Sequence, residues 1–345
     1  MADADPCVAF VGLGSMGKGM ACCLARYLKA NGRQPLRLYN RDPSKLTPLL
    51  EDAELGCVQA ASLADVATSA QIIFMMLSHD TAVRDVVGQL VAALQAGAGA
   101  AGQQEQGLQQ QVPQEQQQEP QELLEQPQQE QPQQERRQRI IVDCSTVSPE
   151  TTADLSRAAQ AVGAAYVACP VLGRPDAAAA ANLLIFCSGP DAAKQALVPY
   201  LGAMGRKVLD LGSEPQKAHI MKLLANFHLV SLIELLSEGM TLAEKNGISR
   251  DTYMSFVDEI LPVPIVHGYG ARMAADAFDA GAGFTVTLGL KDVNLMRKLA
   301  ESSETPLPLA DVAFNHLLSA KAAGLADKDW AALAVAVRKS AGMPE

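Results

Sequence analysis

The stretch Val8-Ala-Phe-Val-Gly-Leu-Gly-Ser-Met-Gly17 decides the fold class of this chain. An apolar run that favours a β-strand ends in Gly12, Gly14 and Gly17, and a helix-forming segment follows at once. This spacing is typical of the first strand, tight turn and helix of a dinucleotide-binding unit, although an ordinary strand, turn and helix can show the same glycines. Gly14 would let the backbone approach a pyrophosphate, which the helix N-terminus would then bind. The sequence therefore predicts a Rossmann domain that binds a redox cofactor at Gly12, Leu13, Gly14, Ser15, Met16 and Gly17.

The residues after a second short strand, expected over 36–39, bear on the choice of cofactor. NAD-preferring sites usually place an Asp or Glu where this chain has Asn40, and here the acid is displaced to Asp42. Arg41, with Lys45 one turn on, offers positive charge to a 2′-phosphate. This favours NADP as the cofactor. The alternative is that Arg41 is a solvated surface residue and that Asp42 only caps the next helix.

Composition limits the classes of protein to consider. The chain has 345 residues, of which 48% are hydrophobic, enough for about two domains. Its net charge of −10 argues against a nucleic-acid partner or an anionic membrane surface. Seven cysteines without a C-x-x-C pair or clustered histidines indicate neither a disulfide framework nor a metal site. No apolar stretch looks long enough to span a bilayer, and the glycine motif begins too near Met1 for a leader, so we expect a cytoplasmic protein.

The pattern of elements divides the chain into two parts. Short strands alternate with helices over residues 1–211, which predicts an α/β domain with a doubly wound parallel sheet. A stretch rich in Gln, Glu and Pro at about 97–138 predicts a disordered insertion that loops out of this domain. Residues 212–345 read as an all-helical domain for substrate binding and oligomerisation, joined to the first by a long helix over 215–245. We expect a cleft between the two domains.

Lys222 and Asn226 are candidates for chemistry because they stand four residues apart in an otherwise apolar helix. That spacing places both on one face of the helix. A lysine in a desolvated cleft has its charged form disfavoured, so that its amine can donate and recover a proton near neutral pH. The alternative is a lysine that reaches the solvent from the rim of an interface.

Four motifs together resemble the β-hydroxyacid dehydrogenase family, the relatives of 3-hydroxyisobutyrate dehydrogenase and of glyoxylate or succinic semialdehyde reductases, with an NAD(P)-binding domain of the 6-phosphogluconate dehydrogenase type. They are G-L-G-S-M-G at 12–17, D-C-S-T-V-S-P at 143–149, M-K-L-L-A-N-F at 221–227 and L-K-D-V-N-L-M at 290–296. Their order and spacing match the family over about 300 residues outside the insertion.

The resemblance implies roles for individual residues. Lys222 would be the general acid and base, with Asn226 assisting. Ser145 would contact the substrate and Thr146 the nicotinamide, although both could merely cap the following helix. Lys291 and Asp292 would close the cleft over cofactor and substrate, unless they only pair with each other on a helix surface. The resemblance also places Met76, Leu77 and Ser78 beside the nicotinamide ribose.

The chain departs from the family at one substrate-binding segment. Where the family has D-A-P-V-S-G-G, this chain reads Ala168-Cys-Pro-Val-Leu-Gly-Arg174. Gly173 remains available to the substrate. Arg174 removes backbone flexibility, but it can add a bidentate donor for an anion. The pattern predicts a divergent subgroup with an altered substrate.

These observations favour an NADP-dependent reductase, reversibly a dehydrogenase, for a small carbonyl compound or 3-hydroxy acid. Two alternatives remain open. One is a non-catalytic NADP-binding scaffold that meets its partners through the Gln-rich insertion, and the other is an imine reductase. A long apolar helix commonly buries its remaining surface against a second copy, so we expect a homodimer or homotetramer.

Overall fold

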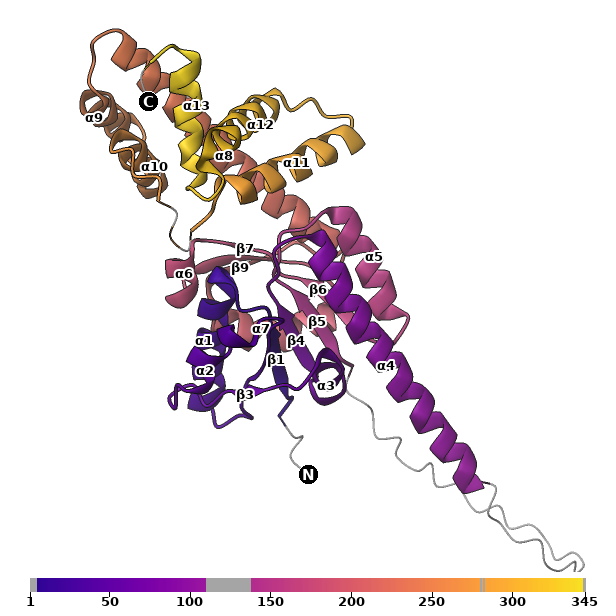
Figure 1. Ribbon diagram of the computed structural model, residues 1–345. Coiled ribbons are helices and arrows are strands. Elements are labelled where there is room, and N and C mark those ends of the chain that lie inside the picture. The colour runs from indigo at the N-terminus through magenta and orange to yellow at the C-terminus, as the bar shows by residue number, and fades with distance from the viewer. Residues whose placement is uncertain (1–4, 110–137, 280, 282, 344–345) are drawn as a thin grey trace, which may run out of the picture.

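The N-terminal half of the chain folds into a parallel six-stranded sheet with helices on both faces (Figure 1). The computed structural model describes residues 5–109, 138–279, 281 and 283–343. The sheet order β3-β2-β1-β4-β5-β6 is that of dinucleotide-binding domains. Its strands are β1 (Val8–Val11), β2 (Arg37–Tyr39), β3 (Val58–Gln59), β4 (Ile72–Met75), β5 (Ile140–Asp143) and β6 (Ala165–Ala168).

Strand β1 shows why the sheet is covered on both sides. All four of its residues are buried and apolar. Because successive side chains of a strand point to opposite faces, Val8 and Phe10 join one hydrophobic core while Ala9 and Val11 join the other. The helices that form these layers are α1 (Ser15–Ala30), α2 (Thr47–Leu50), α3 (Leu63–Ser69), α4 (Asp80–Gln109), α5 (Pro149–Gln160) and α7 (Asp191–Gly202).

A second, three-stranded sheet separates the parallel sheet from the helical domain (Figure 1). The sequence suggested that its strands continue the parallel sheet, but they form their own, in the order β7-β8-β9. Pro170 follows β6 and has no N–H to donate, which favours a change of pairing at that point. Strand β8 then pairs antiparallel with β7 and parallel with β9. The bounds are β7 (Val171–Leu172), α6 (Pro175–Ala179), β8 (Leu183–Cys187) and β9 (Gly205–Asp210).

Helix α4 corrects the predicted start of the insertion. We expected disorder from about residue 97, but α4 continues to Gln109. Ala, Gln and Glu are good helix formers, and the first proline of this region is Pro113. The rest of the predicted insertion lies mainly at 110–137, outside the described residues.

Helix α8 (Gln216–Lys245) carries the helical domain and confirms the expected long connecting helix. It packs against helices on both sides, and Gly247, with φ +78°, follows its C-terminus as expected. Contrary to the sequence analysis, α8 is by length and composition long and apolar enough to cross a membrane. Its buried Lys222, Asn226 and Glu234 and its packing identify it as the core helix of this domain. The other helices are α9 (Arg250–Ile260), α10 (Pro264–Ala274), α11 (Val286–Ser302), α12 (Pro308–Ala320), the turns η2 (Lys321–Leu325) and η3 (Trp330–Ala332), and α13 (Leu333–Ser340).

Candidate active site

The glycine-rich turn has the geometry of a phosphate cradle. Gly12 has φ +93°, and a Cβ on Gly17 would lie 2.0 Å from the carbonyl oxygen of Gly12, so both positions require glycine. Gly14 faces open space, since no described atom lies within 4 Å of where its Cβ would stand. Helix α1 begins at Ser15 without an acidic residue in its described first turn, which leaves its N–H groups to an anion. These residues fit a bound pyrophosphate.

The end of β2 is tied back to this turn. Asn40 Oδ1 accepts a hydrogen bond of 2.8 Å from the N–H of Leu13. The side-chain oxygen of Asn40 is therefore bound within the protein. The carboxylate of Asp42 accepts hydrogen bonds from the backbone N–H and the hydroxyl of Ser44, and it thereby caps the short helix η1 (Pro43–Lys45). The capping role of Asp42 is therefore confirmed. Arg41 is exposed, and its contact with a cofactor stays a prediction.

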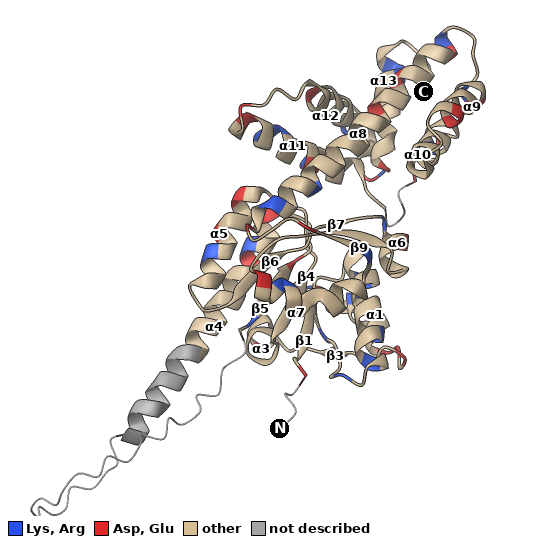
Figure 2. Cartoon of the chain, turned by 180° about the vertical axis from the view of Figure 1, so that it is seen from behind, with Lys and Arg blue, Asp and Glu red and all other residues tan. Residues whose placement is uncertain are grey.

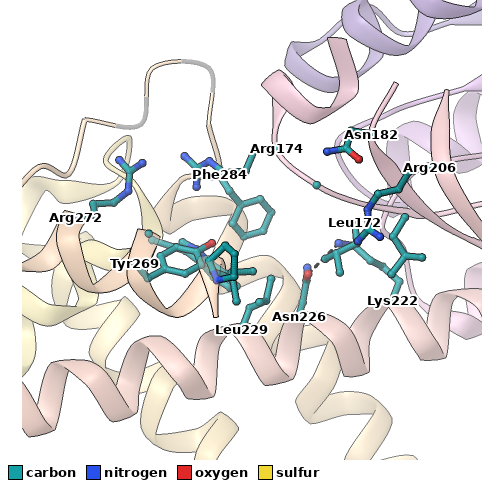
Figure 3. A pocket seen from close by; sticks show the side chains of 16 residues that line it. Leu172, Arg174, Asn182, Arg206, Lys222, Asn226, Leu229, Tyr269, Arg272 and Phe284 are labelled. Atoms are coloured by element: carbon teal, nitrogen blue, oxygen red, sulfur yellow. Dashed lines mark hydrogen bonds between the residues drawn. The ribbon is translucent and has the colours of Figure 1, made fainter. Parts of the chain in front are cut away.

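Two adjoining cavities lie in the cleft between the domains. The glycine-turn cavity, of about 210 Å³, begins at the turn and helix α1. The arginine cavity, of about 420 Å³, lies between the small sheet and helices α8 and α10 (Figure 3). Both are lined by Gly173, Arg174, Lys222 and Phe284, so Lys222 stands where the two cavities meet.

Most of the residues expected at the site line the glycine-turn cavity, although they come from distant parts of the chain. They are Gly14, Ser15, Met16, Gly17, Met76, Leu77, Ser78, Thr146, Gly173, Arg174, Lys222, Lys291 and Asp292. Asn226 lines the arginine cavity. The remaining expected residues line neither cavity, and they are Gly12, Leu13, Asn40, Arg41, Lys45 and Ser145.

Ser145 departs from its expected contact with the substrate. Its side chain is fully buried, and its Oγ accepts a hydrogen bond from the N–H of Leu77. His219 Nε2 lies 3.1 Å from the carbonyl oxygen of Ser145, which can only accept, so Nε2 carries the proton and Nδ1 accepts from the hydroxyl of Thr152 at 2.8 Å. Burial lowers the pKa of His219, which favours this neutral ring. The hydrogen bonds of Ser145 thus fix the loop beside the cavity, and its side chain does not reach the cavity.

Lys222 belongs to a chain of polar side chains that connects α8 with α11. Its Nζ donates to Asn226 Oδ1 at 2.9 Å (Figure 3), and Asn226 Nδ2 donates to Asp292 Oδ2 at 2.6 Å. Lys291 Nζ lies 3.0 Å from Asp292 Oδ1 and donates to the carbonyl oxygen of Thr146 at 2.7 Å. This chain fixes the lysine amine and joins the helical domain to the loop after β5.

The surroundings of Lys222 change its acidity. Its side chain is only 6% exposed, and burial lowers its pKa to about 8, although the nearby Asp292 carboxylate acts in the opposite direction. With that pKa about nine-tenths of the amine is protonated at pH 7. The amine is therefore poised to give a proton near neutral pH and to take one in mildly alkaline solution.

Arg174 is held by an acid that the sequence analysis missed. Its Nη2 lies 2.8 Å from Oδ2 of Asp329, a fully buried carboxylate in the helical domain. Arg272 Nε approaches the same oxygen at 4.0 Å. Asp329 stands far from the family motifs in the sequence. It caps the start of η3, and an aspartate that caps a short helix cannot be told in the sequence from one that also binds an arginine. Arg206, Arg272 and Asn182 were also missed as cavity residues.

The described residues contain no group of three His, Cys, Asp or Glu side chains placed to bind a metal ion. The donors at the site are amines, guanidinium groups and amides, which suit anions and hydrogen-bond acceptors.

Comparison with known families decides what this site belongs to. The family model for the NAD binding domain of 6-phosphogluconate dehydrogenase matches residues 7–103 and 112–212. A second model, for the NAD-binding domain of NADP-dependent 3-hydroxyisobutyrate dehydrogenase, matches residues 217–337. The chain belongs to the β-hydroxyacid dehydrogenase family. Members of this family are NAD(P)-dependent oxidoreductases, and the chain is such an enzyme.

The chain is similar to proteins that match it over nearly its whole length. An uncharacterized oxidoreductase of Bacillus subtilis, YfjR, is 32% identical over 94% of this chain and 98% of its own length. Glyoxylate/succinic semialdehyde reductase 1 of Arabidopsis thaliana is 27% identical over 96% of this chain and 99% of its own. A solved 3-hydroxyisobutyrate dehydrogenase from Mycobacterium tuberculosis shares the fold, with a TM-score of 0.74, 22% identity, and coverage of 96% of this chain and 99% of that one.

Proposed function

We propose that this protein is an NADP(H)-dependent reductase, reversibly a dehydrogenase, that interconverts a small anionic carbonyl compound and its hydroxy acid. The observation that carries the proposal is the position of Lys222, a buried amine with a pKa of about 8 at the junction of the two cavities. Bound nicotinamide supplies or accepts the hydride. The glycine-turn cavity would hold the nicotinamide, and the arginine cavity would hold the substrate.

The protein's own part in the reaction is to orient the substrate and to move one proton. In the direction of reduction, protonated Lys222 Nζ gives its proton to the carbonyl oxygen, which becomes a hydroxyl group. Asn226 keeps the amine aimed into the cleft through its 2.9 Å hydrogen bond. In the reverse direction the neutral amine takes the hydroxyl proton.

The proposal of NADP in place of NAD rests on the end of β2. The carboxylate of Asp42 is engaged by Ser44, so it is not offered to the ribose hydroxyls as in NAD-preferring sites. Arg41 is exposed and makes no hydrogen bond or ion pair with the described residues, which leaves its guanidinium group for a 2′-phosphate.

The decisive experiment compares Lys222→Ala with Lys217→Ala, which removes an exposed lysine from the same helix. We expect Lys222→Ala to lower kcat by on the order of a hundredfold to ten-thousandfold, because general acid catalysis contributes about that much. NADPH affinity, measured by fluorescence titration, should stay close to that of the parent protein. Turnover by Lys222→Ala at the rate of Lys217→Ala would refute the assignment.

The imine reductase hypothesis has some structural support, since an imine reductase from Pseudomonas sp. shares the fold with a TM-score of 0.54 and 18% identity. The arginine cavity argues for an anionic substrate instead, because Arg174, Arg206 and Arg272 line it. A panel of semialdehydes, keto acids and cyclic imines separates the two. A non-catalytic scaffold would bind NADPH and reduce none of them.

We also propose that the protein works as a homodimer or homotetramer without a nucleic-acid or membrane partner. Large apolar side chains are exposed mainly on the helical domain, where Leu242 is 67% and Phe256 is 58% exposed. A second copy would cover them. Lysines and arginines are interspersed with acidic residues over both domains in Figure 2 and form no continuous basic face in that view.

A further inference from the structure

The arginine cavity carries an excess of positive charge on its walls. Its lining contains Lys222, Arg174, Arg206 and Arg272, and within the described chain it contains no carboxylate. Arg174 and Arg272 both approach Asp329, which lies behind the wall, so they share one counter-charge. Arg206 forms no hydrogen bond or ion pair with the described residues. Of the guanidinium groups that line this cavity, that of Arg206 is therefore the one left to bind a ligand.

The backbone directs Arg206 to this place by a β-bulge. Strands β8 and β9 pair Leu183 with Gly205 and then Leu184 with Lys207, so β9 contains one extra residue between these pairs, and that residue is Arg206. A bulge redirects a side chain that a regular strand would point elsewhere. Gly205 allows the close pairing just before it, since a Cβ there would lie 2.8 Å from the carbonyl oxygen of Leu183.

Asn182 lies beside Arg206 on the same wall. Figure 3 shows both on the side of the cavity formed by the small sheet, while Arg272 and Tyr269 lie on the opposite side. The side-chain amide of Asn182 is exposed and makes no hydrogen bond with the described residues. A guanidinium group and an amide on one wall offer several N–H donors to an oxyanion. Leu172 and Leu184, which also line the cavity, provide apolar contact near it.

We propose that Arg206 and Asn182 bind the carboxylate, sulfonate or phosphate group of the substrate whose carbonyl Lys222 protonates. The inference rests on the proposed reductase function and assigns the residues that would select the substrate's oxyanion. A volume of about 420 Å³ lies within the usual range of small-molecule sites. Arg206 is thus a specificity-determining residue, whereas Arg174 mainly connects the two domains through its ion pair with Asp329.

The test compares Arg206→Met with Lys207→Met, which removes the neighbouring exposed cation that lines neither cavity. Each variant is assayed with NADPH and aldehydes of equal chain length that end in a methyl, carboxylate, sulfonate or phosphate group. Arg206→Met should lower kcat/KM for the anionic aldehydes roughly tenfold to a hundredfold, as loss of a charged binding contact does, and leave the neutral aldehyde within about twofold. Lys207→Met should preserve the preference for anions. The terminal group that loses most identifies the natural oxyanion.

A binding measurement keeps the inference separate from the reductase proposal. Saturated monocarboxylates of four to six carbons are titrated calorimetrically into the NADP-loaded protein and its variants. Weaker binding to Arg206→Met, with unchanged binding to Lys207→Met, supports the anion site even if no aldehyde is reduced, in which case only the reductase proposal fails. Equal anion preference and equal carboxylate affinity in all three proteins would overturn the inference.

Discussion

Arg174 Nη2 lies 2.8 Å from Asp329 Oδ2, and this ion pair connects the segment after β7 with the start of η3 in the helical domain. Asp329 is fully buried, while the Arg174 side chain is 33% exposed. The arginine that replaces a glycine of the family motif therefore binds the protein itself across the cleft. Asp329 also accepts a hydrogen bond from the N–H of Ala331, so the pair is anchored in the backbone.

Asp329→Asn should weaken the connection between the domains. The amide can still cap η3, but it leaves Arg174 without its counter-charge, which should cost about 2 kcal/mol of unfolding free energy for a pair that is buried on one side. Urea unfolding followed by the fluorescence of Trp330, the only tryptophan of the chain, measures this change. Asp279→Asn is the control, because that carboxylate is 89% exposed in its pair with Lys328. Equal midpoints for both variants would contradict the role of the pair.

Catalysis should depend on pH through Lys222. Burial lowers the pKa of its amine to about 8, so kcat/KM for reduction, which needs the protonated amine, should be constant below that pH and fall above it. For oxidation, which needs the neutral amine, kcat/KM should rise up to about pH 8 and then level off. Because the Asp292 carboxylate raises this pKa, Asp292→Asn should move both midpoints to lower pH. Asp311→Asn, on the exposed surface of α12, should leave them in place, and a midpoint unmoved by Asp292→Asn would contradict the coupling.

Arg41→Ala should change the choice of cofactor. Losing the guanidinium group should raise KM for NADPH about tenfold and leave KM for NADH nearly unchanged, since only NADPH carries the 2′-phosphate. Arg26→Ala removes an exposed arginine from α1 and serves as the control. Steady-state kinetics with both cofactors decides the matter, and an equal rise in both KM values would argue against recognition of the phosphate.

Gly17→Ala should distort the phosphate cradle. Its Cβ would stand 2.0 Å from the carbonyl oxygen of Gly12, so α1 must move, at a cost of about 1–3 kcal/mol. NADPH binding should weaken at the same time. Gly88→Ala, in helix α4 with no described atom near its Cβ position, should instead stabilise the protein by about 0.5–1 kcal/mol. Thermal unfolding with and without NADPH compares the two, and an equally stable Gly17→Ala protein would contradict the close approach.

The proposed oligomer should depend on the apolar surface of the helical domain. Leu242→Glu should convert the assembly to monomers, because it places a charge in the surface that a second copy would cover. Val198→Glu is matched in exposure but lies in the first domain, and it should leave the assembly intact. Light scattering coupled to gel filtration reports the mass of each. A parent protein that elutes as a monomer would exclude the proposal.

Much of the site could be predicted from local sequence. Strand β1, the glycine turn and the start of α1 are neighbours in the chain, so spacing alone placed Gly14 to Gly17 on a cavity wall. Lys222 and Asn226 share a face of one helix, and their 2.9 Å hydrogen bond follows from that periodicity. Ser145 was misjudged because a serine in a loop motif reads the same whether its hydroxyl faces a substrate or the N–H of Leu77.

The sequence by itself determined the nucleotide-binding fold and the family, and it singled out the lysine that we propose as the proton carrier, because each depends on spacings of a few residues that fix a turn or a helix face. Only the tertiary structure decided that Arg174 pairs with Asp329, that Asp292 orients Asn226, and that a bulge presents Arg206 to the cavity. Partners 66 to 155 residues apart in the chain leave no local pattern, since packing of the two domains brings them together. The packing of the domains pairs Arg174 with Asp329, and it thereby leaves the positive charge of Arg206 for a substrate.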